Sequence, residues 1–178
     1  SMHIVLQSGS NVILKRMNRK YTRQIFMETI DRLRKADPDF TFTTDVIVGF
    51  PGETEADLAE TLAVMGEVKF AKVHMFPFSE RPRTRAATMP NKVPPEVIKE
   101  RKQEVLRSAE RHSFELHNGY VGRTMQVLLE KNESEGGGSI SGHTDNFLQV
   151  RVKSDAGLVP NMLVDVELVS NTPTGLYG

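Results

Sequence analysis

Apolar residues in the first two-thirds of the chain gather in short continuous runs separated by longer segments. The runs 4–7, 42–50 and 72–78 are typical of strands in a parallel sheet, and residues 46–48 are apolar without alternation. These runs recur about every 30–40 residues, which is the spacing of βα units. We therefore predict three βα units, adjacent in one sheet because such crossovers are right-handed.

Helix signals follow each of these runs. A first helix is predicted over about 22–36, with Thr22 as its N-cap and its apolar residues on one face. Thr54 and Asp57 have the spacing of a capping box and predict the start of a second helix. Pro95 opens a long polar helix that reaches about residue 117. The Gly/Ser/Asn segment before the first helix is expected to be a loop.

The pattern changes near residue 118, where helical repeats give way to alternation. Leu148, Val150 and Val152 point one way, while the residues between them point the other. Turns are predicted at 136–138, 155–157 and 160–161. We predict an α/β partial parallel barrel over residues 1–117, followed by a small antiparallel β-barrel over 118–178.

Composition and charge exclude several classes of protein. The 23 basic and 23 acidic residues cancel, so a nucleic-acid site has to be a local patch. With no cysteine, the chain has no disulfide framework, thiolate metal site or thiol nucleophile. The five histidines lack metal-ligand spacing, and no catalytic triad or carboxylate pair stands out. We predict no metal ligands and no catalytic residues within this chain, and a cytoplasmic location, because no membrane span or signal peptide is visible.

The N-terminus begins in the middle of a strand pattern. Ser1 and Met2 resemble a cloning remnant, and the apolar run follows at once. We expect that an upstream part has been removed, although an ordinary terminal strand has the same pattern. An incomplete barrel leaves two sheet edges open, and open edges favour a homodimer or exchange of segments between chains.

Small and polar residues follow each predicted strand. The ends are residues 7–10, 49–53 and 78–81, and in parallel α/β structures ligands bind at this rim. Gly49 and Gly52 permit the close backbone approach that an adenine or ribose needs. Each cluster alone is more typical of a tight turn, but three on one rim favour a ligand site.

Two cationic surfaces are candidates for RNA binding. The loop after the third strand carries Arg81, Arg83 and Arg85, and guanidinium groups suit phosphate or carboxylate recognition. A solvated loop would have the same composition. In the second domain, the outward residues include one aromatic and two cations, which can stack a base and hold phosphates. These residues are Phe147, Arg151 and Lys153, and an ordinary solvated barrel face looks similar.

Three blocks of the sequence resemble the radical S-adenosylmethionine methylthiotransferases. They are residues 3–10 (HIVLQSGS), 16–22 (RMNRKYT) and 44–54 (TDVIVGFPGET). The resemblance covers essentially the whole chain and implies the last part of the central barrel followed by a TRAM domain, an OB-like RNA-binding β-barrel. Residues 74–79 (HMFPFS) most resemble the branch that acts on threonylcarbamoyladenosine beside the tRNA anticodon.

The resemblance also implies a cofactor and its site. The full-length enzyme would use S-adenosylmethionine and 4Fe-4S clusters, whose cysteines lie upstream of this region in the family. We expect no cofactor in this chain and no activity from it alone. The residues that would line the adenosylmethionine are Gln7, Ser8, Ser10, Arg19, Asp45 and Gly49, with Arg19 a candidate for its carboxylate. Family members commonly have glycine and proline where this chain has Arg83 and Arg85.

The predicted function is therefore the addition of a methylthio group to threonylcarbamoyladenosine in tRNA, with tRNA as the partner. Two other branches remain open, one acting on isopentenyladenosine in tRNA and one on a ribosomal protein. Two further alternatives do not depend on the family. One is a free-standing RNA-binding protein with an α/β scaffold, and the other is a small nucleotide-binding enzyme whose barrel serves oligomerisation.

Overall fold

The computed structural model describes residues 1–132, 138–153 and 157–178, which divide into two compact units. The first is Met2–Ala109, and the second is Glu110–Gly178 together with Ser1. This division falls inside helix α4 (Pro95–Asn118), so the domain boundary expected at residue 117 stays a prediction. The turns predicted at 136–138 and 155–157 lie outside the described residues, apart from Gly138 and Gly157.

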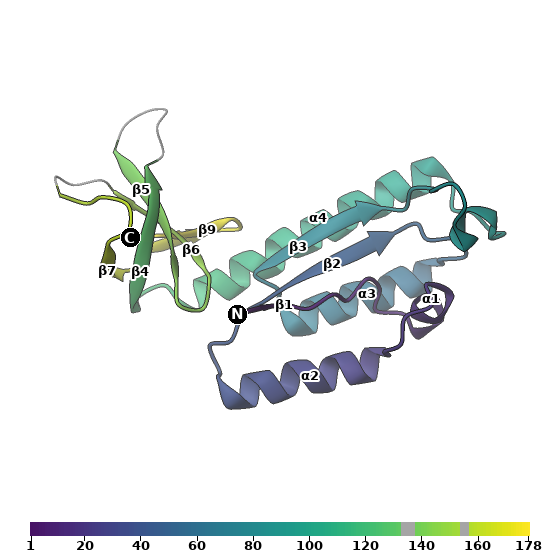
Figure 1. The fold of residues 1–178 in the computed structure, drawn as a ribbon, viewed down its shortest axis with the longest axis horizontal. Helices are drawn as coiled ribbons and strands as arrows, with labels where there is room; N and C mark the ends of the chain where they lie inside the picture. Colours follow the sequence, from purple (N-terminus) through teal and green to yellow (C-terminus); the bar gives the residue numbers. More distant parts are fainter. Residues whose placement is uncertain (133–137, 154–156) are drawn as a thin grey trace. The chain divides into compact units, whose positions relative to one another are not determined.

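A three-stranded parallel sheet forms the centre of the first unit (Figure 1). Its order is β1 (Met2–His3), β2 (Phe42–Val48) and β3 (Lys72–Pro77), which confirms the predicted parallel arrangement. The run 4–7 is not a full strand, since only Gln7 pairs there, in a single parallel bridge with Val46. The arrowheads of β2 and β3 point to the same end of the unit.

The predicted helices are present with their predicted caps. Helices α2 (Arg23–Ala36) and α3 (Glu55–Val68) begin after Thr22 and Thr54, whose hydroxyls accept hydrogen bonds from backbone N–H groups of the first turn. The expected loop before α2 contains a further helix, α1 (Asn11–Arg16). A short 3-10 helix, η1 (Arg85–Thr88), follows β3.

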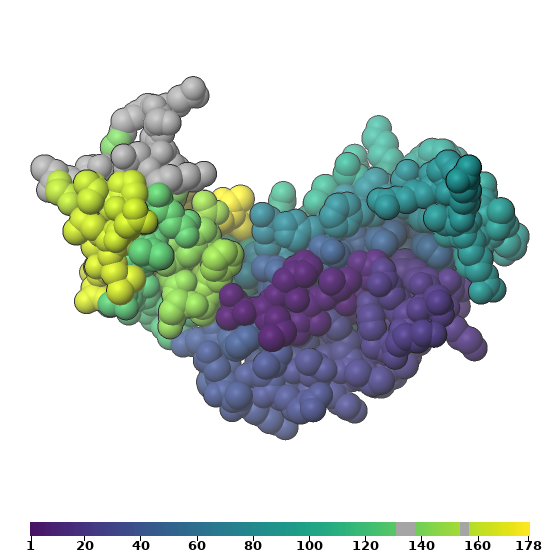
Figure 2. Space-filling view, viewed as in Figure 1, coloured from purple at the N-terminus to yellow at the C-terminus, as the bar shows by residue number. Residues whose placement is uncertain are grey.

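Helices cover one face of this sheet. The core combines buried side chains of α2, α3, β2 and α4, among them Phe26, Phe42, Met65 and Val105. Burial along β2 alternates, with Val46 and Val48 inaccessible and Ile47 half-buried. The sequence predicted a strand covered on both faces, and this is corrected, because Ile47 lies on the less buried face and lines an open cavity. The N-terminal segment lies at the surface of this unit (Figure 2, purple).

The second unit is a curled six-stranded sheet with the order β7-β4-β5-β6-β9-β8 (Figure 1). Its strands are β4 (Thr124–Asn132), β5 (Ser139–Thr144), β6 (Gln149–Lys153), β7 (Leu163–Glu167), β8 (Ser170–Thr172) and β9 (Gly175–Tyr177). The β6–β9 pair is parallel, so the sheet is mixed and the prediction of a wholly antiparallel barrel is corrected. The chain crosses from β7 at one edge to the opposite edge before the β8–β9 hairpin, and this crossing makes β9 parallel to β6.

Candidate functional site

Three loops meet at the ends of the parallel strands. The Ile47 N–H donates to the Gln7 carbonyl at 2.9 Å, and the Phe78 N–H donates to the Val48 carbonyl at 2.8 Å. The segments 7–10, 49–53 and 78–81 therefore lie on one rim, where parallel α/β folds bind ligands. Gln7 adopts a left-handed conformation with φ of 63°, which is uncommon for a residue other than glycine.

Ser8 and Ser10 are buried and bonded within the protein. The Ser10 hydroxyl caps α1 and donates to the Asp57 carboxylate at 2.6 Å. The Ser8 hydroxyl accepts from the Ser10 N–H at 3.2 Å. Between them, a Cβ on Gly9 would lie 2.5 Å from the Glu60 carbonyl oxygen, so only glycine lets this loop pack against α3. These two serines shape the rim and do not line its cavities.

The loop 49–53 is held by a buried ion pair. Gly49 has φ of 77°, and its N–H donates to the Glu53 carboxylate at 2.9 Å. Arg101 of α4 donates to the same carboxylate at 2.8 Å and to Glu55 at 2.6 Å, and its side chain is only 6% exposed. Burial raises the pKa of Glu53 above its ordinary value, and the hydrogen bonds from Gly49 and Arg101 oppose that rise.

Arg16 and Arg19 approach the rim from the C-terminal end of α1. Arg16 donates to the Pro51 carbonyl at 3.1 Å, and Gly52 makes room for it, since a Cβ there would lie 1.5 Å from the guanidinium. Arg19 donates to the Gln7 side-chain oxygen at 2.8 Å. Two of the predicted cofactor residues, Gln7 and Arg19, are thus in direct contact.

Asp45 lies on the open face of the sheet, farther from the rim. It pairs across the sheet with His74, and its carboxylate lies 3.5 Å from His3. Asp45 does not line the cavities at the rim. Of the six predicted cofactor residues, only Arg19 lines them.

Two adjoining cavities occupy the rim, and we call them together the rim groove. The larger has a volume of about 600 Å³, and its walls include Phe50, Phe76, Arg19 and Arg81. The smaller, of about 260 Å³, shares Arg19, Ile47, Phe50 and Ala86 with it and adds Arg85. Phe76 is 51% exposed, and Phe50 packs edge-on against Phe78 with ring centres 5.3 Å apart. The groove thus combines aromatic walls with guanidinium groups, a composition suited to a ring that carries an anionic group.

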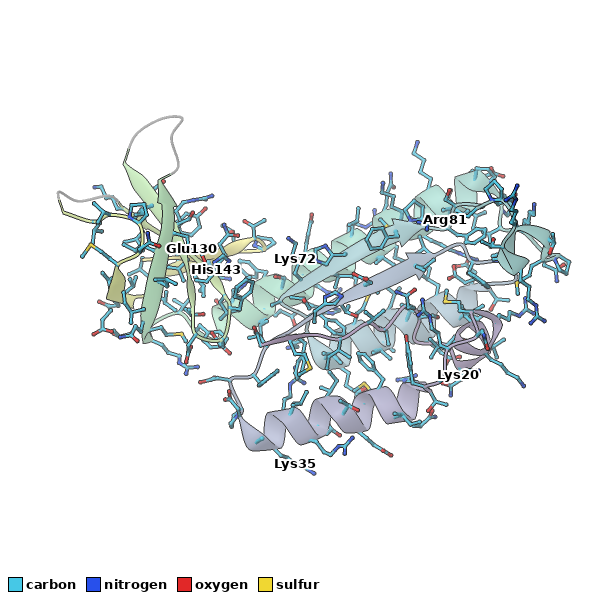
Figure 3. All side chains as sticks on the ribbon, in the orientation of Figure 1. Lys20, Lys35, Lys72, Arg81, Glu130 and His143 are labelled. Atoms are coloured by element: carbon cyan, nitrogen blue, oxygen red, sulfur yellow. The ribbon has the colours of Figure 1, made fainter. Side chains whose placement is uncertain are left out.

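The loop of three arginines divides in the structure. Arg81, labelled in Figure 3, and Arg85 line the rim groove, whereas Arg83 lines neither cavity. The Thr84 hydroxyl donates to the Arg81 carbonyl at 2.8 Å and closes a turn, within which Arg83 has φ of 66°. Composition alone does not distinguish the three arginines. In the structure, the turn places Arg81 and Arg85 at the rim groove and Arg83 outside it.

The predicted RNA-binding residues of the second unit lie around β6. Phe147 is 59% exposed in the turn before β6, and its ring stacks on His143 with centres 4.4 Å apart. His143 also lies 2.9 Å from the carboxylate of Glu130, and both are labelled in Figure 3. Lys153 is exposed, whereas Arg151 is half-buried and donates to the Tyr177 hydroxyl at 2.6 Å. Only part of the predicted stripe is therefore a free outward surface.

Sequence reasoning missed several groups at these sites. The Glu53–Arg101 pair joins residues far apart in the chain, and no local pattern signals it. Phe76 and His143 stand in strands where alternation alone cannot separate a binding face from a solvated one. The helix α1 had a signal, because Ser10 is a good N-cap residue three positions before the apolar pair 13–14.

Within the described residues, no cluster of histidine and acidic side chains suits a metal ion. No helix in the described part of the chain is long and apolar enough to cross a membrane. The chain contains no cysteine, so its own residues do not supply thiolate ligands to an iron–sulfur cluster.

Comparison with known proteins shows which class of enzyme the chain is similar to. Residues 1–65 match the family model described as the Radical SAM superfamily. The whole chain is 45% identical to a threonylcarbamoyladenosine tRNA methylthiotransferase of Chlamydia pneumoniae, of which it spans 42%. It is also 44% identical over 177 residues to a tRNA-2-methylthio-N(6)-dimethylallyladenosine synthase of Thermobifida fusca, with 97% of the chain and 36% of that protein covered.

A third relative supports the same conclusion. The chain is 40% identical over 177 residues to the tRNA-2-methylthio-N(6)-dimethylallyladenosine synthase of Geobacter metallireducens, with 99% of the chain and 40% of that protein covered. The predicted resemblance to the radical S-adenosylmethionine methylthiotransferase family is thus confirmed along the whole chain. The chain spans about two-fifths of the length of the curated relatives it matches.

Proposed function

We propose that this chain is the substrate-facing part of a tRNA methylthiotransferase that acts on threonylcarbamoyladenosine. The observation that carries the proposal is the rim groove, with its aromatic walls and guanidinium groups, in a chain similar throughout to such enzymes. The reaction adds a methylthio group to the adenosine. The dimethylallyladenosine enzymes are the second candidate, because relatives of that name match at 38–45% identity.

S-Adenosylmethionine and iron–sulfur clusters would serve the whole enzyme. Arg19, Ile47 and Phe50 fit the cofactor, since a guanidinium can bind its carboxylate and apolar side chains can contact its adenine. When bound, the cofactor supplies the methyl group and the radical chemistry. The contribution of this chain is to orient it through the Gln7–Arg19 contact and to shield the site with aromatic side chains.

The second unit would dock the tRNA as a TRAM, OB-like module. The stacked pair of Phe147 and His143 can hold a base, and Lys153 and Arg151 can neutralise phosphates. A cytoplasmic location and a homodimer through open sheet edges stay predictions. Neither is needed for this docking.

Filter binding of tRNA to this chain tests the docking surface. Exchange of Phe147 for alanine and Lys153 for glutamate is expected to weaken binding about tenfold or more, because stacking contributes roughly 1–3 kcal/mol per base. Binding to the parent is expected to fall steeply as salt rises, because phosphate contacts release counterions. Arg151 is left unchanged, since its bond to Tyr177 makes it part of the fold.

The control is Lys72→Glu, a change of the same charge on an exposed lysine of the first unit. A doubly substituted protein that keeps its circular dichroism and holds tRNA as well as the parent would contradict this docking surface. Loss of binding on substitution of the arginine loop alone would place the RNA there instead.

A further inference from the structure

The arginines of the rim groove differ in what they contact. Arg16 and Arg19 both donate to protein oxygens, those of Pro51 and Gln7. Within the described residues, the guanidinium groups of Arg81 and Arg85 form no ion pair and no hydrogen bond. Glu80 is adjacent to Arg81 in sequence, but its carboxylate pairs with Lys92 at 2.6 Å. Two cations of the groove are therefore left for an anion from outside.

The backbone holds these two arginines at the groove. Arg81 begins a turn, which is closed by a hydrogen bond of 3.2 Å from the Thr84 N–H to the Arg81 carbonyl. Arg85 begins η1, and its carbonyl accepts the Thr88 hydroxyl at 3.0 Å. Ala86, directly after Arg85, lines both cavities, so the start of η1 forms part of their common wall. Fixed turns of this kind reduce the entropy lost when a ligand binds.

The two kinds of relative differ in the group carried by the target adenosine. A threonylcarbamoyl group joins threonine through its amine and keeps a free carboxylate, whereas a dimethylallyl group is a small uncharged hydrocarbon. A carboxylate binds guanidinium groups through strong charge-assisted hydrogen bonds. The hydrocarbon would leave both cations without a partner, which selects against it.

We propose that Arg81 and Arg85 bind the carboxylate of the threonylcarbamoyl group and so determine the choice of substrate. The inference rests on the proposed function and deepens it. Phe76 contacts the uncharged part of the modified base, and the two guanidinium groups take its anionic end. The groove's larger cavity, about 600 Å³, is within the range that holds ligands of this size.

The test compares anticodon stem-loop RNAs that differ only in one adenosine. In the first RNA this adenosine is unmodified, in the second it carries a threonylcarbamoyl group, and in the third a dimethylallyl group. Binding of each RNA to this chain is measured by fluorescence anisotropy. The parent is expected to bind the threonylcarbamoyl RNA roughly tenfold or more tightly than either of the other two RNAs. Hydrogen bonds to charged groups contribute a free energy of that size. Arg81→Gln and Arg85→Gln are expected to lose most of this preference. Arg83→Gln is the matched control, because it changes the same loop but lines neither cavity, and it is expected to keep the preference.

Equal affinity of the parent for the threonylcarbamoyl and dimethylallyl RNAs would overturn the inference. The same holds if all three arginine variants weaken every RNA equally, because the loop would then be contacting phosphates. Titration with the modified nucleoside alone, followed by NMR shifts of Phe76 and Ala86, separates this inference from the docking proposal. If the stem-loops do not bind but the nucleoside still causes NMR shifts that depend on Arg81, only the proposed docking of RNA is contradicted. Absence of nucleoside shifts would overturn the carboxylate site.

Discussion

At the scale of single residues, Asp57 connects the segments that shape the rim. Its carboxylate accepts from the Ser10 hydroxyl at 2.6 Å and from the Thr54 hydroxyl at 2.6 Å and N–H at 2.8 Å. Burial alone would raise the pKa of Asp57, but these hydrogen bonds outweigh it and lower the pKa below its ordinary value. One carboxylate thus joins the N-termini of α1 and α3.

This arrangement predicts a pH-dependent contribution to stability. Because the folded pKa is depressed, the stabilisation is fully present above the unfolded value of about 3.9 and is lost as pH falls towards the folded pKa. Asp57→Asn is expected to lower the free energy of unfolding by roughly 1–2 kcal/mol at neutral pH, as loss of a cap does. Urea denaturation followed by circular dichroism, from pH 7 to pH 3, measures the difference.

The difference between the parent and Asp57→Asn is expected to shrink below about pH 4. Asp31→Asn serves as the control, because Asp31 is an exposed carboxylate on α2. A difference that stays constant down to pH 3 would show that the charge of Asp57 does not contribute.

At the scale of elements, α4 anchors the loop 49–53 to the first unit. Arg101 lies within the part of α4 that belongs to this unit, and it bonds to the carboxylate and the carbonyl of Glu53. Ile98, one turn earlier in α4, fills the space beside Gly49. A Cβ added to Gly49 would lie 2.4 Å from the Ile98 side chain. The position of the rim loop therefore depends on a helix distant in sequence.

Removal of one partner of this pair is expected to destabilise the first unit strongly. Arg101→Met leaves the Glu53 carboxylate buried without its cation, which costs about 3–5 kcal/mol when a buried pair is broken. The double variant Arg101→Met with Glu53→Gln is expected to recover part of the loss, since no uncompensated charge remains. Thermal unfolding of the three proteins measures these differences. Equal stability of the single and double variants would show that the charge of Glu53 is not the cause.

The elements differ in how far the sequence could predict them. Thr22, Thr54 and Asp57 act within a few residues of their helices, so the local pattern located both caps. The parallel pair β6–β9 and the ion pair of Arg101 depend on contacts between distant segments, which no local pattern encodes. The same limit applies to prediction of the candidate site from the sequence. Its rim was predictable from the strand ends, but the separation of Arg83 from Arg81 and Arg85 follows from a turn with a left-handed residue.

At the scale of the whole molecule, each of the two units carries one of the two surfaces that we propose for tRNA. The first unit holds the rim groove, and the second carries the stacked pair of Phe147 and His143 and the exposed Lys153. Each surface alone is compatible with a general RNA-binding protein. Because the chain is similar throughout to tRNA methylthiotransferases, we propose that both surfaces contact a tRNA.

The most direct test places this chain in a working enzyme. Its 178 residues replace the matching segment of the Chlamydia pneumoniae methylthiotransferase, and nucleosides of tRNA treated with the chimera are identified by mass spectrometry. Intact cluster absorption and a folded circular dichroism spectrum are the controls. We expect methylthio-threonylcarbamoyladenosine as the product, with loss of that product in the chimera carrying Arg81→Gln and Arg85→Gln. A folded chimera with its clusters that leaves threonylcarbamoyladenosine unchanged, or that modifies dimethylallyladenosine instead, would contradict the proposed function.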